Sequence, residues 1–283
     1  MNTKISIEEL AHYISPTGKL TDIQAVQTQH RLHLAEFWGI HAGENILEIG
    51  CGQGDTTAIL AYLTGNTGSV HAVDIASPDY GSPETLGEAI AKLQQSPIGK
   101  QITVSFDTDI LAPEVDFPEN TFDTIVFSHS SWYVNSQETL LEMFAKLNKW
   151  SKRLVFAEWD TRVTESHQLP HFLAALLQAQ YESFRQTTEA NIRTLITPED
   201  SLILAEKAGW RITKEATIPS KQLQDGEWEV AMTLSDAPDI ITSLQSVPDK
   251  FKTLLTSELN TLKTYNQQSS IQSMDTFAFI AVK

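Results

Sequence analysis

Residues 45–55 read NILEIGCGQGD, an apolar run that carries one carboxylate and leads into three glycines, Gly50, Gly52 and Gly54. The pattern predicts a buried strand, a tight turn and then a helix. Glycine at such a turn lets the backbone approach a ligand without an intervening Cβ, and the start of the following helix presents unpaired N–H groups. We therefore expect a small molecule to bind at this turn.

The charges beside the turn indicate which class of small molecule. Glu48 and Asp55 flank the glycines, and at about 4 Å from a pyrophosphate the repulsion would cost roughly a few kcal/mol. A dinucleotide fingerprint also needs glycine or alanine three residues after its second glycine. That position, counted from Gly52, is Asp55, so the segment reads GxGxG and favours a ligand with cationic groups over NAD.

Composition narrows the partners and the compartment. The chain has 283 residues, a net charge of −16 and one cysteine, Cys51. The negative charge makes nucleic acid and anionic membrane surfaces unfavourable partners, and a single cysteine excludes an internal disulfide. No segment reaches about 18 uncharged apolar residues. We expect a soluble, cytoplasmic protein without stable membrane association. The sequence does not indicate an oligomeric state.

Short apolar runs alternate with helical patterns after the turn. Further strands are expected at 69–75, 101–107, 122–128, 153–159 and 210–218 and in the last ten residues, with helices at about 54–64, 83–95 and 137–150 and from Thr197. This order predicts an α/β fold with a doubly wound, mostly parallel, seven-stranded sheet covered on both faces.

Three segments do not fit the alternation. We interpret residues 1–40 as an N-terminal helical cap, and we assign residues 41–283 to one domain with helical insertions at about 164–192 and 222–268. Ligands of open α/β sheets bind outside the carboxyl ends of the strands. The extra helices are therefore expected to cover that edge and to set specificity.

The motifs follow one another as ExGxGxG at 48–54, an acid at Asp74, DTD after the third strand and FD at the start of the fourth. This order resembles that of the class I S-adenosylmethionine-dependent methyltransferases. The resemblance covers about residues 40–160. It implies a Rossmann-like fold with an antiparallel last strand, S-adenosyl-L-methionine as cofactor, and methyl transfer to a small-molecule acceptor by in-line displacement. No metal is chemically needed for that reaction.

The resemblance also implies roles for residues along the strand ends. The glycine loop would hold the methionine part of the cofactor, Asp74 the two ribose hydroxyls, and Asp109 the adenine amino group. One carboxylate suits a pair of hydroxyls because it can accept from both. Cys51 is interpreted as a small filler of the loop. The implied cofactor-binding residues are Glu48, Gly50, Cys51, Gly52, Gly54, Asp74, Ile75, Asp109 and Ser128.

The residues that contact the methyl acceptor are predicted to lie in the loop after the fourth strand. His129 is the candidate general base, although a histidine there could instead bond to the backbone. Trp132 and Tyr133 are candidate walls of the acceptor pocket, or they pack against the next helix. Positioning alone can supply roughly 7–11 kcal/mol to such a transfer, so a base is required only for a poor nucleophile.

Two other functions are compatible with the motifs of about residues 40–160, which concern only the cofactor. One is a cyclopropane-fatty-acid-synthase-like enzyme, which would use the same cofactor on a lipid double bond. Cys51 lies inside the glycine loop and cannot furnish the pocket cysteine of that family. The other is a non-catalytic protein that binds S-adenosylmethionine and acts through partners.

Overall fold

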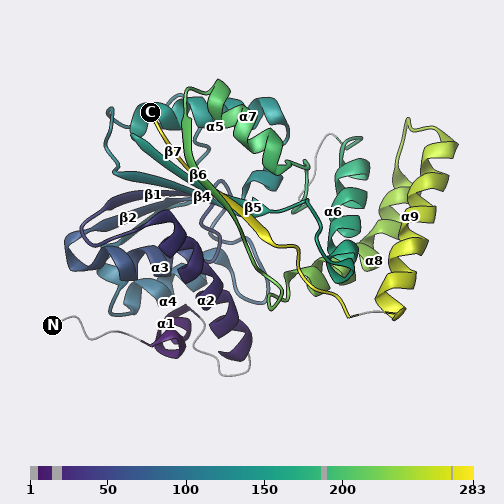
Figure 1. Cartoon of the computed structure of the whole chain (residues 1–283), viewed down its shortest axis with the longest axis horizontal. Coiled ribbons are helices and arrows are strands. Elements are labelled where there is room, and N and C mark those ends of the chain that lie inside the picture. The colour runs from purple at the N-terminus through teal and green to yellow at the C-terminus, as the bar shows by residue number, and fades with distance from the viewer. Residues whose placement is uncertain (1–5, 15–20, 186–189, 269) are drawn as a thin grey trace.

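The chain forms one seven-stranded sheet flanked by helices (Figure 1), in a computed structural model that describes residues 6–14, 21–185, 190–268 and 270–283. The strand order is β3-β2-β1-β4-β5-β7-β6. The strands are β1 (Asn45–Ile49), β2 (Ser69–Val73), β3 (Ile102–Ser105), β4 (Thr124–Ser128), β5 (Arg153–Trp159), β6 (Arg211–Ile218) and β7 (Thr276–Val282).

The sheet has the predicted mixed topology. Strands β1 to β5 pair in parallel, whereas β7 runs antiparallel between β5 and β6. The third strand is shorter than the predicted 101–107, because the chain turns away where Asp107 adopts a left-handed conformation with φ 51°. The parallel strands end together at one edge of the sheet, where the predicted site residues lie.

Helices cover both faces of the sheet and its carboxyl edge. They are α1 (Ile7–Ile14), α2 (Thr21–Trp38), α3 (Asp55–Thr64), α4 (Leu86–Gln95), α5 (Gln137–Trp150), α6 (Leu169–Glu182), α7 (Pro198–Lys207), α8 (Asp225–Ser243) and α9 (Asp249–Gln268). The predicted start of α7 is confirmed, since Thr197 and Asp200 form a reciprocal capping box with Pro198 at the first helical position.

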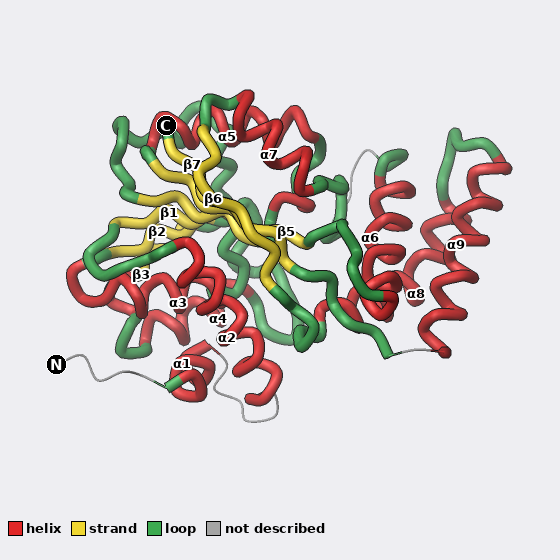
Figure 2. The backbone as a smooth tube through the Cα atoms, in the orientation of Figure 1, coloured by secondary structure: helices red, strands yellow, loops and turns green. Residues whose placement is uncertain are grey.

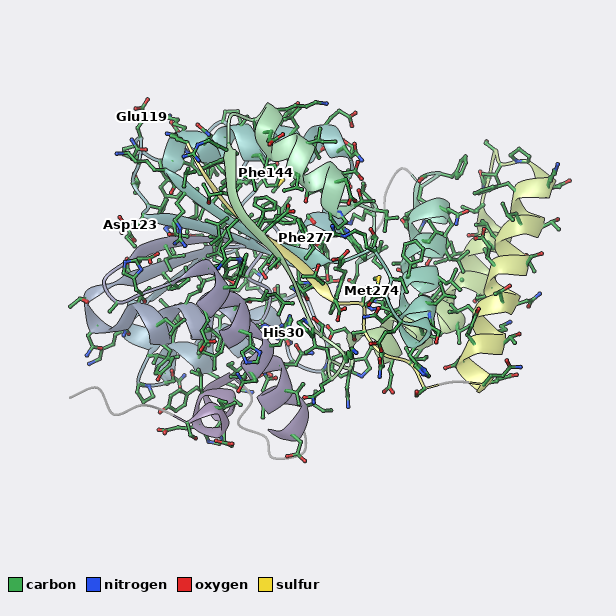
Figure 3. All side chains as sticks on the ribbon, in the orientation of Figure 1. His30, Glu119, Asp123, Phe144, Met274 and Phe277 are labelled. Atoms are coloured by element: carbon green, nitrogen blue, oxygen red, sulfur yellow. The ribbon has the colours of Figure 1, made fainter. Side chains whose placement is uncertain are left out.

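Successive strand residues point to opposite faces, so each face has its own core. On one face Ile46 and Val126 pack beneath α2, α3 and α4, together with Trp38 of α2. On the other face Phe144 of α5 and Phe277 of β7 belong to an aromatic core (Figure 3). Helix α2 therefore contributes to the main core, and the division of the chain at residue 40 stays a prediction.

Helices α6, α8 and α9 form a third group beyond the carboxyl edge of the sheet (Figure 2). They share a separate apolar cluster that includes Leu177, Ala237 and Leu259. The insertion at 222–268 thus consists of two helices, and α8 places its first turns against the strand ends. Within the described ranges, no helix combines the length and apolar character needed to cross a bilayer.

Candidate cofactor and acceptor site

The glycine turn has the backbone that its sequence predicts. Gly50, Gly52 and Gly54 have φ values of 74°, 52° and 90°. A Cβ on Gly54 would lie 2.7 Å from Cδ1 of Ile90, so this glycine allows close packing of α4. A Cβ on Gly52 would meet nothing within 4 Å. The turn is therefore packed on one side and open on the other, which leaves room for a ligand at Gly52.

Asp74 joins the end of β2 to this turn. Its Oδ2 accepts a hydrogen bond from the N–H of Gly52 at 2.8 Å, and its Oδ1 accepts one from Ala76 at 2.9 Å. A carboxylate has about four acceptor positions, so two remain. Ile75 beside it is 68% exposed, an unusual state for an isoleucine that follows a buried strand. The contacts to ribose and adenine that the resemblance implies for these two residues stay a prediction.

Glu48 lies beneath the turn. Its carboxyl is buried and accepts a hydrogen bond from Oγ1 of Thr57 at 2.5 Å. Burial raises the pKa of Glu48 to about 8, so the group is largely protonated near neutral pH. The negative charge beside the turn therefore comes from Asp74 and Asp55 rather than from Glu48, which differs from the expectation. Cys51 is a buried free thiol whose pKa burial raises.

The other predicted cofactor residues lie at neighbouring strand ends. Asp109 is exposed in the loop after β3 and accepts from the N–H of Leu111 at 2.8 Å. That loop is bonded to β2 through the N–H of Thr108 and the carbonyl of Asp74. At the end of β4, Oγ of Ser128 is buried without a hydrogen-bond partner among the described residues. A buried hydroxyl without a partner calls for an explanation, and a bound water or ligand is one that fits this position.

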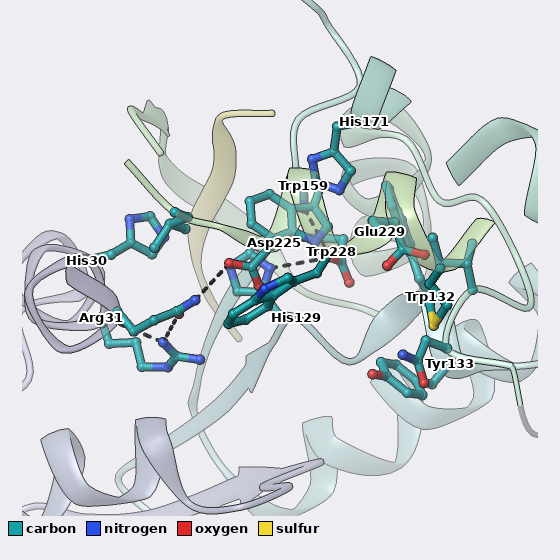
Figure 4. Close-up of a pocket in the computed structure, with 16 residues that line it drawn as sticks. His30, Arg31, His129, Trp132, Tyr133, Trp159, His171, Asp225, Trp228 and Glu229 are labelled. Atoms are coloured by element: carbon teal, nitrogen blue, oxygen red, sulfur yellow. Dashed lines mark hydrogen bonds and ion pairs between the residues drawn. The ribbon is translucent and has the colours of Figure 1, made fainter. Parts of the chain in front are cut away.

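A cavity of about 340 Å³ lies beside these strand ends (Figure 4). Its walls come from α2, the loop after β4, the end of β5, α6 and α8. Its described lining residues are Gln27, His30, Arg31, His129, Trp132, Tyr133, Glu158, Trp159, His171, Asn191, Ile192, Leu223, Asp225, Trp228, Glu229 and Met232. The volume and the aromatic walls are typical of a small-molecule site.

His129 occupies a constrained position in this cavity. Its backbone is left-handed with φ 49°, and its N–H donates to the carbonyl of Ala157 at 2.8 Å. Its Nδ1 lies 3.5 Å from Oε1 of Glu158, without hydrogen-bond geometry. The ring packs against Trp159 at a centroid distance of 4.7 Å. A histidine in such a backbone conformation is uncommon and is characteristic of functional sites.

Glu158 is the next-to-last residue of β5, and several donors hold its carboxylate. Its Oε2 accepts from the N–H and the hydroxyl of Ser131 at 3.1 and 2.7 Å, and its Oε1 accepts from the N–H of Trp159 at 3.0 Å. The carboxylate is buried, so these bonds replace its lost hydration. Glu158 is therefore fixed in the position from which it faces His129.

Two further histidines in the cavity wall are neutral. Nδ1 of His171 accepts from the N–H of Met274 at 3.0 Å, and burial lowers the pKa of His171 to about 3. His30 lies 3.1 Å from Oγ1 of Thr276, and burial lowers its pKa to about 2. Both imidazoles therefore act as uncharged hydrogen-bonding groups near neutral pH.

Glutamine side chains connect the helices around the cavity. Gln27 of α2 donates to Asp225 of α8 at 2.8 Å and accepts from Arg31. Gln178 of α6 donates to Glu229 of α8, and burial raises the pKa of Glu229. These bonds hold α2, α8 and α6 around one space.

The cavity brings together part of the predicted acceptor site. His129, Trp132 and Tyr133 all line it, although Tyr133 is 44% exposed at its rim. Several lining residues were not predicted, namely Glu158, Trp159, Asp225, Trp228 and Glu229. Glu158 and Trp159 end a predicted strand, so the strand-end rule could have found them. Helix α8 carries no such signal. The described residues contain no group of three or more His, Cys, Asp or Glu suited to a metal ion.

The fold and this site define a class of protein. A doubly wound sheet with an open glycine turn, a strand-end acid and an enclosed cavity next to them is the arrangement of an α/β protein that holds a nucleoside-bearing cofactor beside a second molecule. A family described as "Methyltransferase domain" matches residues 24–215. The chain belongs to the class I S-adenosylmethionine-dependent methyltransferase family, and S-adenosylmethionine is its cofactor.

Individual relatives agree with this assignment. Methyltransferase phomM' of Diaporthe leptostromiformis is 26% identical over 231 residues, which are 68% of this chain and 60% of that protein. The ubiquinone/menaquinone biosynthesis C-methyltransferase UbiE of Escherichia coli is 26% identical over 165 residues, covering 54% of this chain and 61% of UbiE. The chain thus spans about 60% of the length of these curated relatives.

A solved structure is more similar over its whole length. The cyclopropane-fatty-acyl-phospholipid synthase-like protein from Lactobacillus casei ATCC 334 superposes with a TM-score of 0.86 and 34% identity, covering 98% of each chain. The helical additions of the present chain are therefore shared with that protein, since the superposition includes them.

Proposed function

We propose that this protein transfers the methyl group of S-adenosylmethionine to a small-molecule acceptor bound in the cavity. One observation carries the proposal. Strand β4 ends at Ser128, whose buried hydroxyl lacks a partner among the described residues, and the next residue, His129, lines the cavity. The predicted cofactor groove and the cavity are therefore adjacent, as a direct transfer requires.

The residues of the turn fit the cofactor. The open space at Gly52 admits a ligand close to the backbone, and Asp74 keeps acceptor positions for two ribose hydroxyls. Arg31 is the natural partner for the carboxylate of the methionine part, because a guanidinium binds carboxylates in a bidentate manner. When bound, the cofactor supplies an electrophilic methyl group. The protein orients the acceptor and excludes water from it.

A second function is suggested by the name of the Lactobacillus casei protein, which points to methylene transfer into a lipid double bond. The cavity argues against it here. An acyl chain requires an elongated apolar channel, whereas histidines, carboxylates and Arg31 line this cavity. Cys51 lies buried in the glycine loop rather than in the cavity wall. Methyl transfer to a compact acceptor therefore remains the better proposal.

One experiment separates the three functions. Purified protein is incubated with S-adenosylmethionine and a broad library of phenols, enols, amines and thiols, and in parallel with vesicles of unsaturated phospholipid. Release of S-adenosylhomocysteine with a methylated library compound supports the proposal. Cyclopropane formation in the vesicles would replace it with lipid modification. Cofactor affinity in calorimetry without any product would indicate a non-catalytic binding protein.

We also propose a cytoplasmic location and no nucleic-acid partner. The single cysteine, a free thiol, supports a reducing compartment, and the net charge of −16 disfavours polyanions. We further propose that α2 acts as the cap over the site, supported by its hydrogen bonds to both α3 and α8: Gln24 to Asp55 and Gln27 to Asp225.

A further inference from the structure

The carboxylates in the cavity wall already have partners. Glu158 accepts three hydrogen bonds, from Ser131 and Trp159. Asp225 accepts from Gln27, and Glu229 accepts from Gln178. These bonds hold the cavity wall together, and Glu158 has the fewest acceptor positions left of the three acids.

His129 offers the cavity a hydrogen-bond acceptor. Its buried Nδ1 faces the Glu158 carboxylate at 3.5 Å, and a lone pair on Nδ1 would be repelled by that charge. The proton of the neutral ring therefore belongs on Nδ1, and the lone pair belongs on Nε2. Since 23% of the side chain is exposed while Nδ1 is buried, the edge on the cavity carries Nε2. Hydrogen bonds of this kind are often long before the substrate binds.

His171 offers the opposite group, a donor. Because its Nδ1 accepts from the N–H of Met274, the proton of its neutral ring lies on Nε2. No described residue accepts a hydrogen bond from that Nε2–H. His171 lines the cavity from α6 and is almost fully buried there, so a ligand that fills the cavity is the partner that we assign to this N–H.

Aromatic rings bring these two groups together. The indole of Trp159 packs against His129 at 4.7 Å and against His171 at 5.0 Å (Figure 4). Trp132 and Trp228 form further parts of the wall. The rings meet at interplanar angles of 58° and 73°, so they present both faces and edges, and aromatic ligands pack favourably in either arrangement. The cavity thus suits an aromatic or otherwise planar molecule that donates one hydrogen bond and accepts another.

Resting on the proposed function, we propose that the acceptor is a planar hydroxyl compound, a phenol or an enol, with a second oxygen that accepts a hydrogen bond from His171. The acceptor hydroxyl gives its proton to Nε2 of His129. Its oxygen forms a bond to the methyl carbon while the carbon–sulfur bond breaks, and that electron pair remains on sulfur as the neutral thioether of S-adenosylhomocysteine. Glu158 is a positioning residue, because it orients His129 and stabilises the imidazolium that forms.

The substrate class is tested with matched probes. Initial rates are measured with S-adenosylmethionine and 2-, 3- and 4-acetylphenol, with phenol itself, and with benzylamine and 4-aminoacetophenone as amines of similar size. We expect at least one acetylphenol to be methylated on oxygen with a kcat/KM about tenfold above that of phenol, the value of one hydrogen bond to a neutral donor. The amines are expected to react more slowly than either.

Two variants test the assigned roles. His171→Phe keeps an aromatic ring but removes the donor, so the acetylphenol should lose its advantage while the rate with phenol changes little. Glu158→Gln should lower kcat about 100-fold or more, with cofactor affinity and the KM for the acceptor nearly unchanged. The exposed residues His12 and Glu142 provide matched controls as His12→Phe and Glu142→Gln.

The outcomes distinguish this inference from the function on which it rests. Methylation of the amines in preference to the phenols would overturn the inference and leave methyl transfer intact. An unchanged acetylphenol advantage in His171→Phe would remove His171 from the substrate site, even if Glu158→Gln failed to fold. Absence of product from every library class, with the cofactor bound, would instead reject the proposed function itself.

Discussion

The glycine turn and the acceptor cavity meet at the end of β4, yet their polar groups are arranged differently. At the turn, the backbone N–H groups of Gly52 and Ala76 donate to Asp74. The single segment 45–55 supplies the strand, the three glycines and the start of the helix. In the cavity, side chains of α2 and α6 donate to acids of α8, and Glu158 of β5 accepts from Ser131 in the loop after β4. A region built by one short segment can be recognised in the sequence. A region assembled from distant helices becomes visible only after folding.

The two regions should respond differently to substitution, and His129 provides the strongest test. His129→Ala is expected to lower kcat about 100-fold or more with an acceptor that needs a base, while the cofactor Kd changes less than about twofold. Steady-state kinetics and titration calorimetry measure the two quantities. Equal losses in turnover and affinity would assign His129 to the cofactor side. The exposed His12→Ala is the control.

The protonated carboxyl beneath the turn predicts a pH dependence of stability. The pKa of Glu48 is about 8 in the folded protein and 4.5 unfolded, so the unfolded chain binds fewer protons between these values and the free energy of unfolding falls as pH rises. His30 and His171 have lowered folded pKa values and act in the opposite direction, mainly below about pH 7, because their imidazoles titrate around 6.5 in the unfolded chain.

Above about pH 7 the Glu48 effect should therefore dominate, with a slope below the limiting value of about 1.4 kcal/mol per pH unit because Glu48 itself loses its proton near pH 8. We expect the cofactor-free protein to lose about 1 kcal/mol between about pH 6.5 and 8 in urea titrations, after the opposing contribution of the two histidines is subtracted. Glu48→Gln resembles the protonated carboxyl and should flatten the curve. A wild-type stability that stays level or rises across the same interval would contradict the buried, protonated state.

The ribose assignment of Asp74 is the next test. Asp74→Ala should weaken cofactor binding more than tenfold, because it removes the acceptor for two hydroxyls and a bond to Gly52. Asp74→Asn keeps one side-chain oxygen, so its cofactor affinity should lie between that of the wild type and that of Asp74→Ala. Affinity is measured by titration calorimetry with S-adenosylhomocysteine, and the exposed Asp239→Ala is the control. Unchanged affinity in Asp74→Ala would place the ribose elsewhere.

The smallest effect is expected at the junction between the two regions. Gln27→Leu removes the hydrogen bond to Asp225 and should raise the KM for the acceptor about threefold to tenfold. The cofactor Kd should change less. Gln29→Leu on the same helix, where the amide contacts His33, serves as the comparison. A larger effect on the cofactor than on the acceptor would mean that α2 belongs to the cofactor region.

The sequence predicted the cofactor region more fully than the cavity. Periodicity and strand ends located the sheet, the turn and Asp74, because these depend on local pattern. The charge state of Glu48 was interpreted incorrectly, although a strand covered on both faces implies a buried side chain. Trp228 and Glu229 could not be assigned from α8, because their approach to the strand ends depends on how that helix packs against α6 and α2.

Among the residues that the structure describes, glutamines rather than lysines or arginines join α2, α6 and α8 around the cavity. Gln24, Gln27 and Gln178 each donate an amide proton to an acid on a neighbouring helix. Dissolved salt weakens ion pairs but has little effect on a bond whose donor is uncharged. In a chain with a net charge of −16, added salt also screens repulsion between acids. The cavity should therefore hold its shape, and its affinity for an uncharged acceptor, in concentrated electrolyte.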